Sequence, residues 1–204
     1  MPTFNFKPKI IVKKLLEALP SRGRDVLSSR YGLGKSPVKM TLEGIGDTYG
    51  ITRERVRQIE NASITNIRKS KTYKECASVF DEIKKIIEAL GSIISEEDFL
   101  NHIAPKDKAL QNAVHFLLVV GEPFKKLKED EDFKHRWHTN DVHAKKIEEA
   151  LKKLYKSLSD EELLPESEII ERFLKHIEDV NAEFKTDEIL KRWLSLSKKI
   201  GRNP

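Results

Sequence analysis

The hydrophobic pattern in the first part of the chain predicts short amphipathic helices. Apolar residues recur at three- and four-residue intervals over residues 10–18, which is typical of one helix face. Ser21 is expected to cap a second helix, and Gly32 or Gly34 is expected to end it. The stretch that follows contains Pro37 and is predicted to be a loop.

Two further helices are predicted on either side of Gly50. Thr41 is expected to cap the first and Thr52 the second, because a hydroxyl can accept a bond from an early backbone N–H. The positions expected to face inward are Leu42, Ile45 and Tyr49 in the first helix and Val56, Ile59, Ser63, Ile64 and Ile67 in the second. Two helices joined by a short glycine-containing turn form a helix-turn-helix.

The rest of the chain predicts a second kind of unit. Helices are expected over residues 80–90, 95–103 and 108–120, with Ser95 as a cap. Residues 124–127 and 133–137 flank a polar stretch and predict a β-hairpin. Three helices followed by a hairpin is the order of a winged helix. Phe124, Phe133 and Trp137 are expected to form the hairpin core.

Three more helices are predicted over residues 142–158, 166–177 and 186–200. They repeat the winged-helix order without its hairpin, and the chain ends at residues 201–204 where a hairpin would begin. We therefore expect a mainly α protein with three parts: a helix-turn-helix domain over 1–75, a winged-helix-like domain over 76–140, and a helical segment over 141–204. A truncated second winged helix stays open for the last part.

The charge is unevenly distributed between these parts. Residues 1–75 hold 16 Lys and Arg against 7 Asp and Glu, a net charge of +9. Residues 76–204 hold 22 against 26, a net charge of −4. An excess of basic residues on one domain is the electrostatic mark of nucleic-acid binding, although a solvated surface would also account for it. The second part is expected to serve protein interaction or scaffolding.

The chemistry of the helix after Thr52 fits base recognition. In a helix-turn-helix the second helix lies in the major groove, and its first turns contact base edges. Those turns carry Arg53, Glu54, Arg57 and Gln58. Arginine suits guanine, glutamine suits adenine, and glutamate can accept from cytosine. The residues better placed for phosphates are Arg55, Arg68 and Lys69.

The same residues carry a family resemblance. The strings LPSRGRDVLSSRYGL (19–33) and MTLEGIGDTYGITRERVRQIENASITNIRK (40–69) closely resemble region 4 of the sigma-70 family. The resemblance implies a helix-turn-helix that reads the −35 promoter element and docks on the flap of the RNA polymerase β subunit. It covers about a quarter of the chain. The DNA-binding residues expected are Thr41, Thr52, Arg53, Glu54, Arg55, Arg57, Gln58, Arg68 and Lys69.

The sequence also departs from that family. Gly44 and Gly23 stand where a helix former is expected, and each glycine costs about 1 kcal/mol of helix propensity. No segment resembles the regions that open the −10 element and grip the polymerase clamp. We therefore expect a sigma factor-like regulator that is not self-sufficient as a sigma factor. A fragment of a longer protein stays an open alternative.

Two functions are consistent with these features. The first is sequence-specific binding of double-stranded DNA in bacterial transcription, with RNA polymerase as a partner. The alternative is a protein-interaction module that docks on RNA polymerase, as region 4 does, without reading DNA. Neither function needs a cofactor or a small-molecule substrate.

The sequence offers little support for an enzyme or a metal site. His135, His138 and His143 are close in sequence, but their spacing matches no established ligand pattern and no cysteine is near. The acidic run Glu161, Glu162, Glu166 and Glu168 is interpreted as a solvated surface. Cys76 is the single cysteine, no run is long enough to span a membrane, and no signal peptide is recognised, so we expect a cytoplasmic protein.

Overall fold

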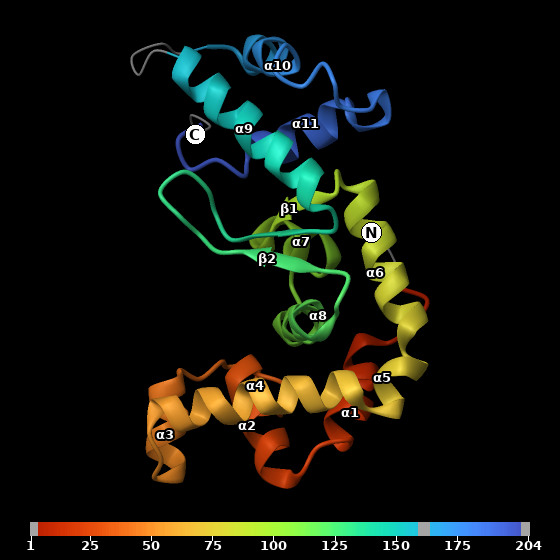
Figure 1. Cartoon of the computed structure of the whole chain (residues 1–204), viewed down its shortest axis with the longest axis vertical. Coiled ribbons are helices and arrows are strands. Elements are labelled where there is room, and N and C mark those ends of the chain that lie inside the picture. Colours follow the sequence, from red (N-terminus) through yellow and green to blue (C-terminus); the bar gives the residue numbers. More distant parts are fainter. Residues whose placement is uncertain (1–3, 159–163, 201–204) are drawn as a thin grey trace. The chain divides into compact units, whose positions relative to one another are not determined.

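The computed structural model describes residues 4–158 and 164–200 (Figure 1). Within these residues the chain forms eleven α-helices, one 3-10 helix and one three-stranded sheet, which confirms the prediction of a mainly α fold. The chain divides into two compact units. The first comprises residues 1–83 and 100–123, and the second comprises residues 84–99 and 124–204. The divisions fall within α6 (Ala77–Ala89) and α7 (Glu96–Ile103).

The first unit is helical. Its complete helices are α1 (Pro8–Glu17), α2 (Ser21–Tyr31), α3 (Leu42–Tyr49), α4 (Arg53–Lys69), α5 (Lys71–Glu75) and α8 (Lys108–Val120). Helices α3 and α4 meet at a sharp turn and form the predicted helix-turn-helix (Figure 1). The predicted helix at 108–120 agrees in both bounds with α8.

Side-chain caps fix where the helices of this motif begin. The Thr41 hydroxyl accepts from the Gly44 N–H at 3.0 Å, and the Thr52 hydroxyl accepts from the Arg55 N–H at 3.2 Å, so both predicted caps are confirmed. The cap predicted at Ser21 is wrong. Ser21 is already the first residue of α2, and the residue before it is a proline whose side chain has no group to cap with. Gly50 has φ +62° and turns the chain from α3 into α4.

The helix-turn-helix has a small core of its own. Val26, Ile45 and Val56 are fully buried, and they come from α2, α3 and α4 respectively. The partly buried residues packed against them are Met40, Leu42, Ile51 and Ile59. Tyr49 was expected to face inward, but its side chain is exposed. It is the last residue of α3 and lies beyond the cluster that Ile45 joins.

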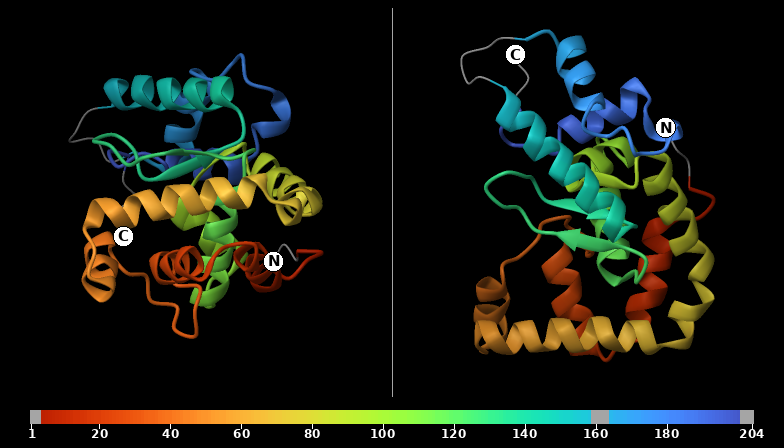
Figure 2. Two further views of the ribbon diagram at one scale, coloured as in Figure 1. Left: turned by 60° about the horizontal axis from the view of Figure 1, so that its bottom comes forward. Right: turned by 45° about the horizontal axis from the view of Figure 1, so that its top comes forward.

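Helix α8 completes the first unit. Every residue from Gln111 to Leu118 is buried, and the helix packs on α1, α2 and α4 (Figure 2). Its length and its apolar composition allow it to be covered on several sides. The sequence assigned this helix to a winged-helix-like domain at 76–140, whereas here it shares a compact unit with α1–α5. The three predicted domain boundaries stay a prediction.

The second unit combines a small sheet with helices. Its elements are β1 (Ile93–Ser95), β2 (Lys125–Leu127), β3 (Arg136–His138), α9 (Asp141–Ser157), α10 (Glu166–Leu174), the 3-10 helix η1 (Ala182–Phe184) and α11 (Asp187–Leu194). The predicted hairpin is confirmed, with Lys126 opposite Trp137 in antiparallel register. Strand β1 was not predicted. It pairs with the other edge of β3, placing Ile94 opposite Trp137.

The core of the second unit lies between the sheet and the helices that follow it. Helix α9 crosses the sheet (Figure 2), and its Ile147, Leu151 and Leu154 pack in one cluster with Phe133 and Trp193. The hairpin aromatics Phe124, Phe133 and Trp137 are all buried, so their predicted core role is confirmed. Helix α11 ends at Leu194, earlier than predicted. Glu161, Glu162 and residues 201–204 lie outside the described residues.

In the described parts of the chain, no helix is both long and apolar enough to cross a membrane.

Candidate nucleic-acid interface

The first two turns of α4 present a polar face whose direction is fixed by one buried side chain. Val56 is fully buried, and this rotates the opposite side of the helix outward. Glu54, Arg57 and Gln58 lie on that outward side and are all exposed. We call this side of α4 the recognition face. Arg53 and Arg55 lie at its two edges, since they sit on either side of Glu54 in the helix. The structure thus brings together five of the predicted site residues.

Four of these side chains, Glu54, Arg55, Arg57 and Gln58, form a hydrogen-bonded group. Arg57 donates to both carboxylate oxygens of Glu54, at 2.8 and 2.7 Å. Gln58 reaches the same carboxylate at 3.5 Å through its amide, and its own carbonyl oxygen accepts from Arg55 at 3.1 Å. The bonds from Arg57 lower the pKa of Glu54, and the bonds to Glu54 raise the pKa of Arg57. The pair is therefore charged on both sides at neutral pH.

Arg53 connects the two helices of the motif. Its guanidinium lies 2.9 Å from the Glu43 carboxylate at the start of α3. Both side chains are more than half exposed, so this ion pair adds little to stability. It does hold the Arg53 guanidinium at the edge of the recognition face.

The two threonines of the site are helix caps. The hydroxyls of Thr41 and Thr52 each accept a backbone N–H, and both residues are exposed. This cap role explains why a threonine stands at each position. Contact of either residue with DNA stays a prediction.

Arg68 and Lys69 lie at the far end of α4, away from the recognition face. Arg68 donates to the backbone carbonyls of Val119 and Val120, both at 3.0 Å. Its guanidinium therefore holds the end of α8, an arrangement the sequence did not indicate. Lys69 is exposed. The phosphate contacts expected of these two residues stay predictions.

Asn61 was not predicted from the sequence as a site residue. It is exposed and lies one helical turn beyond Arg57, on the same side of α4. An asparagine amide can pair with adenine as glutamine does. Its four-residue spacing from Arg57 could have predicted this position from the sequence and would have extended the recognition face by one turn.

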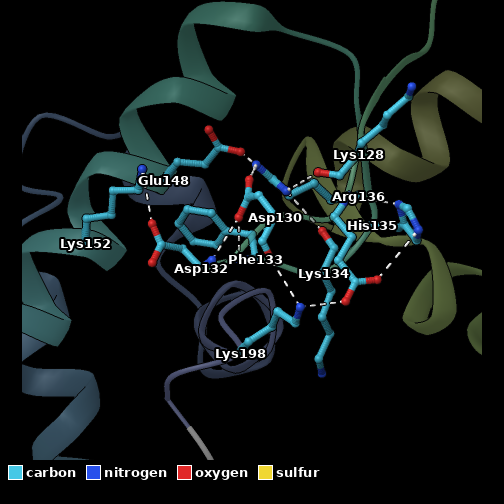
Figure 3. Close-up of polar contacts among 11 residues, drawn as sticks. Lys128, Asp130, Asp132, Phe133, Lys134, His135, Arg136, Glu148, Lys152 and Lys198 are labelled. Atoms are coloured by element: carbon cyan, nitrogen blue, oxygen red, sulfur yellow. Dashed lines mark hydrogen bonds and ion pairs between the residues drawn. The ribbon is translucent and has the colours of Figure 1, made fainter.

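The hairpin turn of the second unit contains four consecutive acidic residues. Glu129, Asp130, Glu131 and Asp132 follow one another there, and neighbouring basic groups hold several of them (Figure 3). Lys198 contacts Glu129 at 2.6 Å. Bonds from lysine side chains lower the pKa values of Glu129 and Asp132. Burial raises the pKa of Asp130, but bonds from backbone N–H groups and from Arg136 outweigh it, so this pKa is also low.

Arg136 anchors that turn through its buried guanidinium. It is buried, and it forms ion pairs with Asp130 at 3.2 Å and with Glu148 of α9. It also donates to the carbonyls of Lys128 and Lys134, so the turn is tied down from both sides (Figure 3). A buried cation with this many partners has a structural role.

The three candidate histidines of this unit have separate surroundings. His135 accepts from the Glu129 N–H at 2.9 Å. His138 is buried in β3, and His143 lies against the ring of Trp193. Burial lowers the pKa of both His138 and His143. Among the described residues, no group of three or more His, Cys, Asp or Glu side chains is arranged to hold a metal ion.

Comparison with known proteins identifies the helix-turn-helix. Residues 15–69 match the family model for sigma-70, region 4. The chain is 47% identical over 57 residues to the RNA polymerase sigma factor SigA of Nostoc sp. strain PCC 7120. It is 46% identical over 57 residues to SigA of Synechocystis sp. strain PCC 6803 and 48% identical over 54 residues to SigA1 of Synechococcus elongatus.

The similarity to sigma-70 region 4 is confined to one segment. The Nostoc match covers 28% of this chain and 14% of the relative, and the other two cover 13% of theirs. No solved structure matched the chain. The region 4 match contains the whole of α2, α3 and α4, and with them the five clustered side chains. It supports a DNA-binding, transcription-related role for this segment.

Proposed function

We propose that this protein binds double-stranded DNA sequence-specifically in bacterial transcription, as a regulator of initiation that recognises a −35-like element. The observation that carries the proposal is the exposed face of α4, where Glu54, Arg57 and Gln58 lie together within the segment similar to sigma-70 region 4. All three side chains carry groups that pair with base edges in the major groove. The protein acts without catalysis and without a cofactor.

Glu54 and Arg57 are paired with each other in the free protein and would separate when the face binds DNA. In free protein each side chain satisfies the other, and both are about half exposed. Water screens an exposed pair of this kind, so DNA can separate it at small cost. Arg57 is then free for the O6 and N7 atoms of a guanine, while Glu54 accepts from a cytosine amine. Because the two partners prefer different bases, their separation on DNA depends on the sequence.

Phosphate contacts supply the remaining affinity. The net charge of +9 on residues 1–75 favours association with a polyanion, and Arg53 and Arg55 lie at the edges of the recognition face. The second unit, residues 84–99 and 124–204, holds 20 Lys and Arg against 22 Asp and Glu, a net charge of −2, so it has no excess of positive charge for DNA. We assign that unit to protein interaction or scaffolding.

RNA polymerase is the proposed protein partner. The matched relatives are RNA polymerase sigma factors, and the matched segment is the region for which the family resemblance implies docking on the β-subunit flap. A second candidate function follows from the same similarity: docking on polymerase without reading DNA. In that case the α4 face would contact protein, and binding would not depend on DNA sequence.

A mobility-shift assay separates the two functions. The full chain is titrated with a duplex that carries a −35-like element and with a scrambled duplex of the same composition. The proposal predicts tighter binding to the first duplex, a steep loss of affinity with added salt, and loss of the preference in Arg57→Ala. Lys153→Ala, an exposed charge removal on α9, is the matched control and should bind as the wild type does. Equal affinity for both duplexes would favour the docking function.

A further inference from the structure

Helix α8 contacts the segment that leads into the helix-turn-helix. Asn112 is 1% exposed, and its side-chain amide donates to the carbonyls of Gly32 and Pro37, at 3.1 and 2.8 Å. Both acceptors belong to the connection between α2 and α3. One buried side chain thus fixes two points of this connection, and a neutral hydrogen bond to a buried carbonyl is costly to lose.

The local sequence is adapted to this contact. Gly32 has φ +62°, and a Cβ atom there would lie 2.6 Å from the amide nitrogen of Asn112. Only glycine therefore permits both the backbone conformation and the close approach. Further along the connection, the Met40 N–H donates to the Ser29 carbonyl at 2.9 Å, and Thr41 then caps α3. The connection held by Asn112 therefore leads directly to the residue that caps α3.

A second contact links α8 to the other end of the motif. Arg68, in the last turn of α4, donates to the carbonyls of Val119 and Val120 at the end of α8. Helix α8 thus holds the chain ahead of α3 through Asn112 and the end of α4 through its last carbonyls. It lies outside residues 15–69, the segment that matches sigma-70 region 4.

We propose that α8 is a built-in part of the DNA-binding unit and that Asn112 is a positioning residue for it. Asn112 holds the α2–α3 connection so that α3, and the recognition helix that packs on it, present the base-reading face in one orientation. The proposal rests on the proposed function, since it assigns to α8 the positioning of the α4 face. It extends that function to a helix beyond the segment shared with sigma factors.

The neighbouring residue supplies a matched control. Gln111 is also a buried amide on α8, but it donates to the Asn101 side chain at 3.1 Å and to the Ala104 carbonyl at 2.8 Å. Both of these acceptors precede α8 and lie outside the helix-turn-helix. Gln111 also accepts from Lys108 of α8 at 3.3 Å. Gln111→Ala therefore removes a pair of donated bonds comparable to that of Asn112, together with this accepted bond, without touching the α2–α3 connection.

The test compares Asn112→Ala, Asn112→Ser and Gln111→Ala in the full chain. The serine variant keeps a polar group that is too short to reach both carbonyls, and it serves if the alanine variant does not fold. Thermal unfolding first shows that each variant is folded at the assay temperature. Affinity is then measured for the −35-like and scrambled duplexes, and amide hydrogen exchange is measured over residues 33–40.

We expect the Asn112 variants to lose about tenfold in preference for the −35-like duplex, and the amides of residues 33–40 to exchange faster. Gln111→Ala should keep the preference and the slow exchange, even if it lowers the melting temperature equally. If the wild type shows the preference and the Asn112 variants keep it, the positioning role is overturned while the proposed function stands. If the wild type shows no preference, the proposed function fails. Unchanged exchange in the Asn112 variants would then overturn the positioning role separately.

Discussion

Arg57 donates two hydrogen bonds to Glu54 on the exposed face of α4, at 2.8 and 2.7 Å. The two residues are three positions apart, which brings their side chains together on one side of the helix. Both are among the residues that we propose to read bases. The same two side chains therefore bind each other in the free protein and are proposed to bind bases in the complex. Each can be tested by its own substitution.

Loss of the arginine should weaken specific binding. Arg57→Ala removes the group that matches guanine in two hydrogen bonds, so affinity for the cognate duplex should fall by about 1–3 kcal/mol. Fluorescence anisotropy with cognate and scrambled duplexes measures the effect. The scrambled duplex should lose much less. An equal loss on both duplexes would show that Arg57 contacts phosphate and reads no base.

Loss of the glutamate charge should have the opposite effect on non-specific binding. Glu54→Gln removes a negative charge from the recognition face and weakens its hold on Arg57, so affinity for scrambled DNA should rise. Discrimination between duplexes should fall, because Glu54 no longer rejects bases that cannot donate to it. The same anisotropy titrations give both quantities. A variant with unchanged affinity for scrambled DNA would count against a DNA-facing Glu54.

Two glycines of α3 should respond differently to alanine. A Cβ atom at Gly44 would have its nearest contact at 3.4 Å, so Gly44→Ala should stabilise the protein by about 0.5–1 kcal/mol through helix propensity. A Cβ atom at Gly46 would lie 2.6 Å from the Ile51 carbonyl oxygen, so Gly46→Ala should destabilise it by about 1–3 kcal/mol. Urea unfolding measures both. Equal effects of the two substitutions would contradict the described turn.

The stability of the second unit should fall as the pH drops from about 7 to 5. Burial lowers the pKa of His138 below its ordinary value, with Lys125 acting in the same direction and Asp141 opposing it. Since the unfolded chain takes up a proton at higher pH than the folded chain, the stability from a neutral His138 is complete above pH 6.5 and is lost below it. His143 shifts the same way.

The check is urea unfolding of the wild type and of His138→Gln at pH 7 and pH 5. Tryptophan fluorescence reports the unfolding, because Trp137 and Trp193 both lie in the second unit. The wild type should lose more stability between these pH values than the variant does. Parallel losses in both proteins would show that other groups titrate in this window.

The sequence predicted the local features of the first unit well, because they depend on neighbouring residues. The caps at Thr41 and Thr52, the turn at Gly50 and the outward face of α4 follow from spacing and side-chain chemistry alone. Tyr49 was misplaced because helical periodicity does not show that α3 ends there. Ser21 was misplaced because the preceding proline takes the position before the first helical residue.

The long-range features could not be predicted in the same way. Strand β1 is three residues long and fully buried, so it shows no alternation of apolar and polar residues. The contacts of Arg68 and Asn112 join residues 52 and 80 positions apart in the chain. Nothing in the local pattern distinguishes Arg68, which holds α8, from an exposed arginine able to contact phosphate.

The most direct test of the account is the selection of preferred sequences from a pool of random duplexes by the full chain. The account predicts that one −35-like motif is enriched and that Arg57→Ala loses the preference at a single base pair of that motif, while Lys153→Ala selects the wild-type motif unchanged. Enrichment of no motif by the wild type, or of the same motif by Arg57→Ala, would contradict base reading by the α4 face.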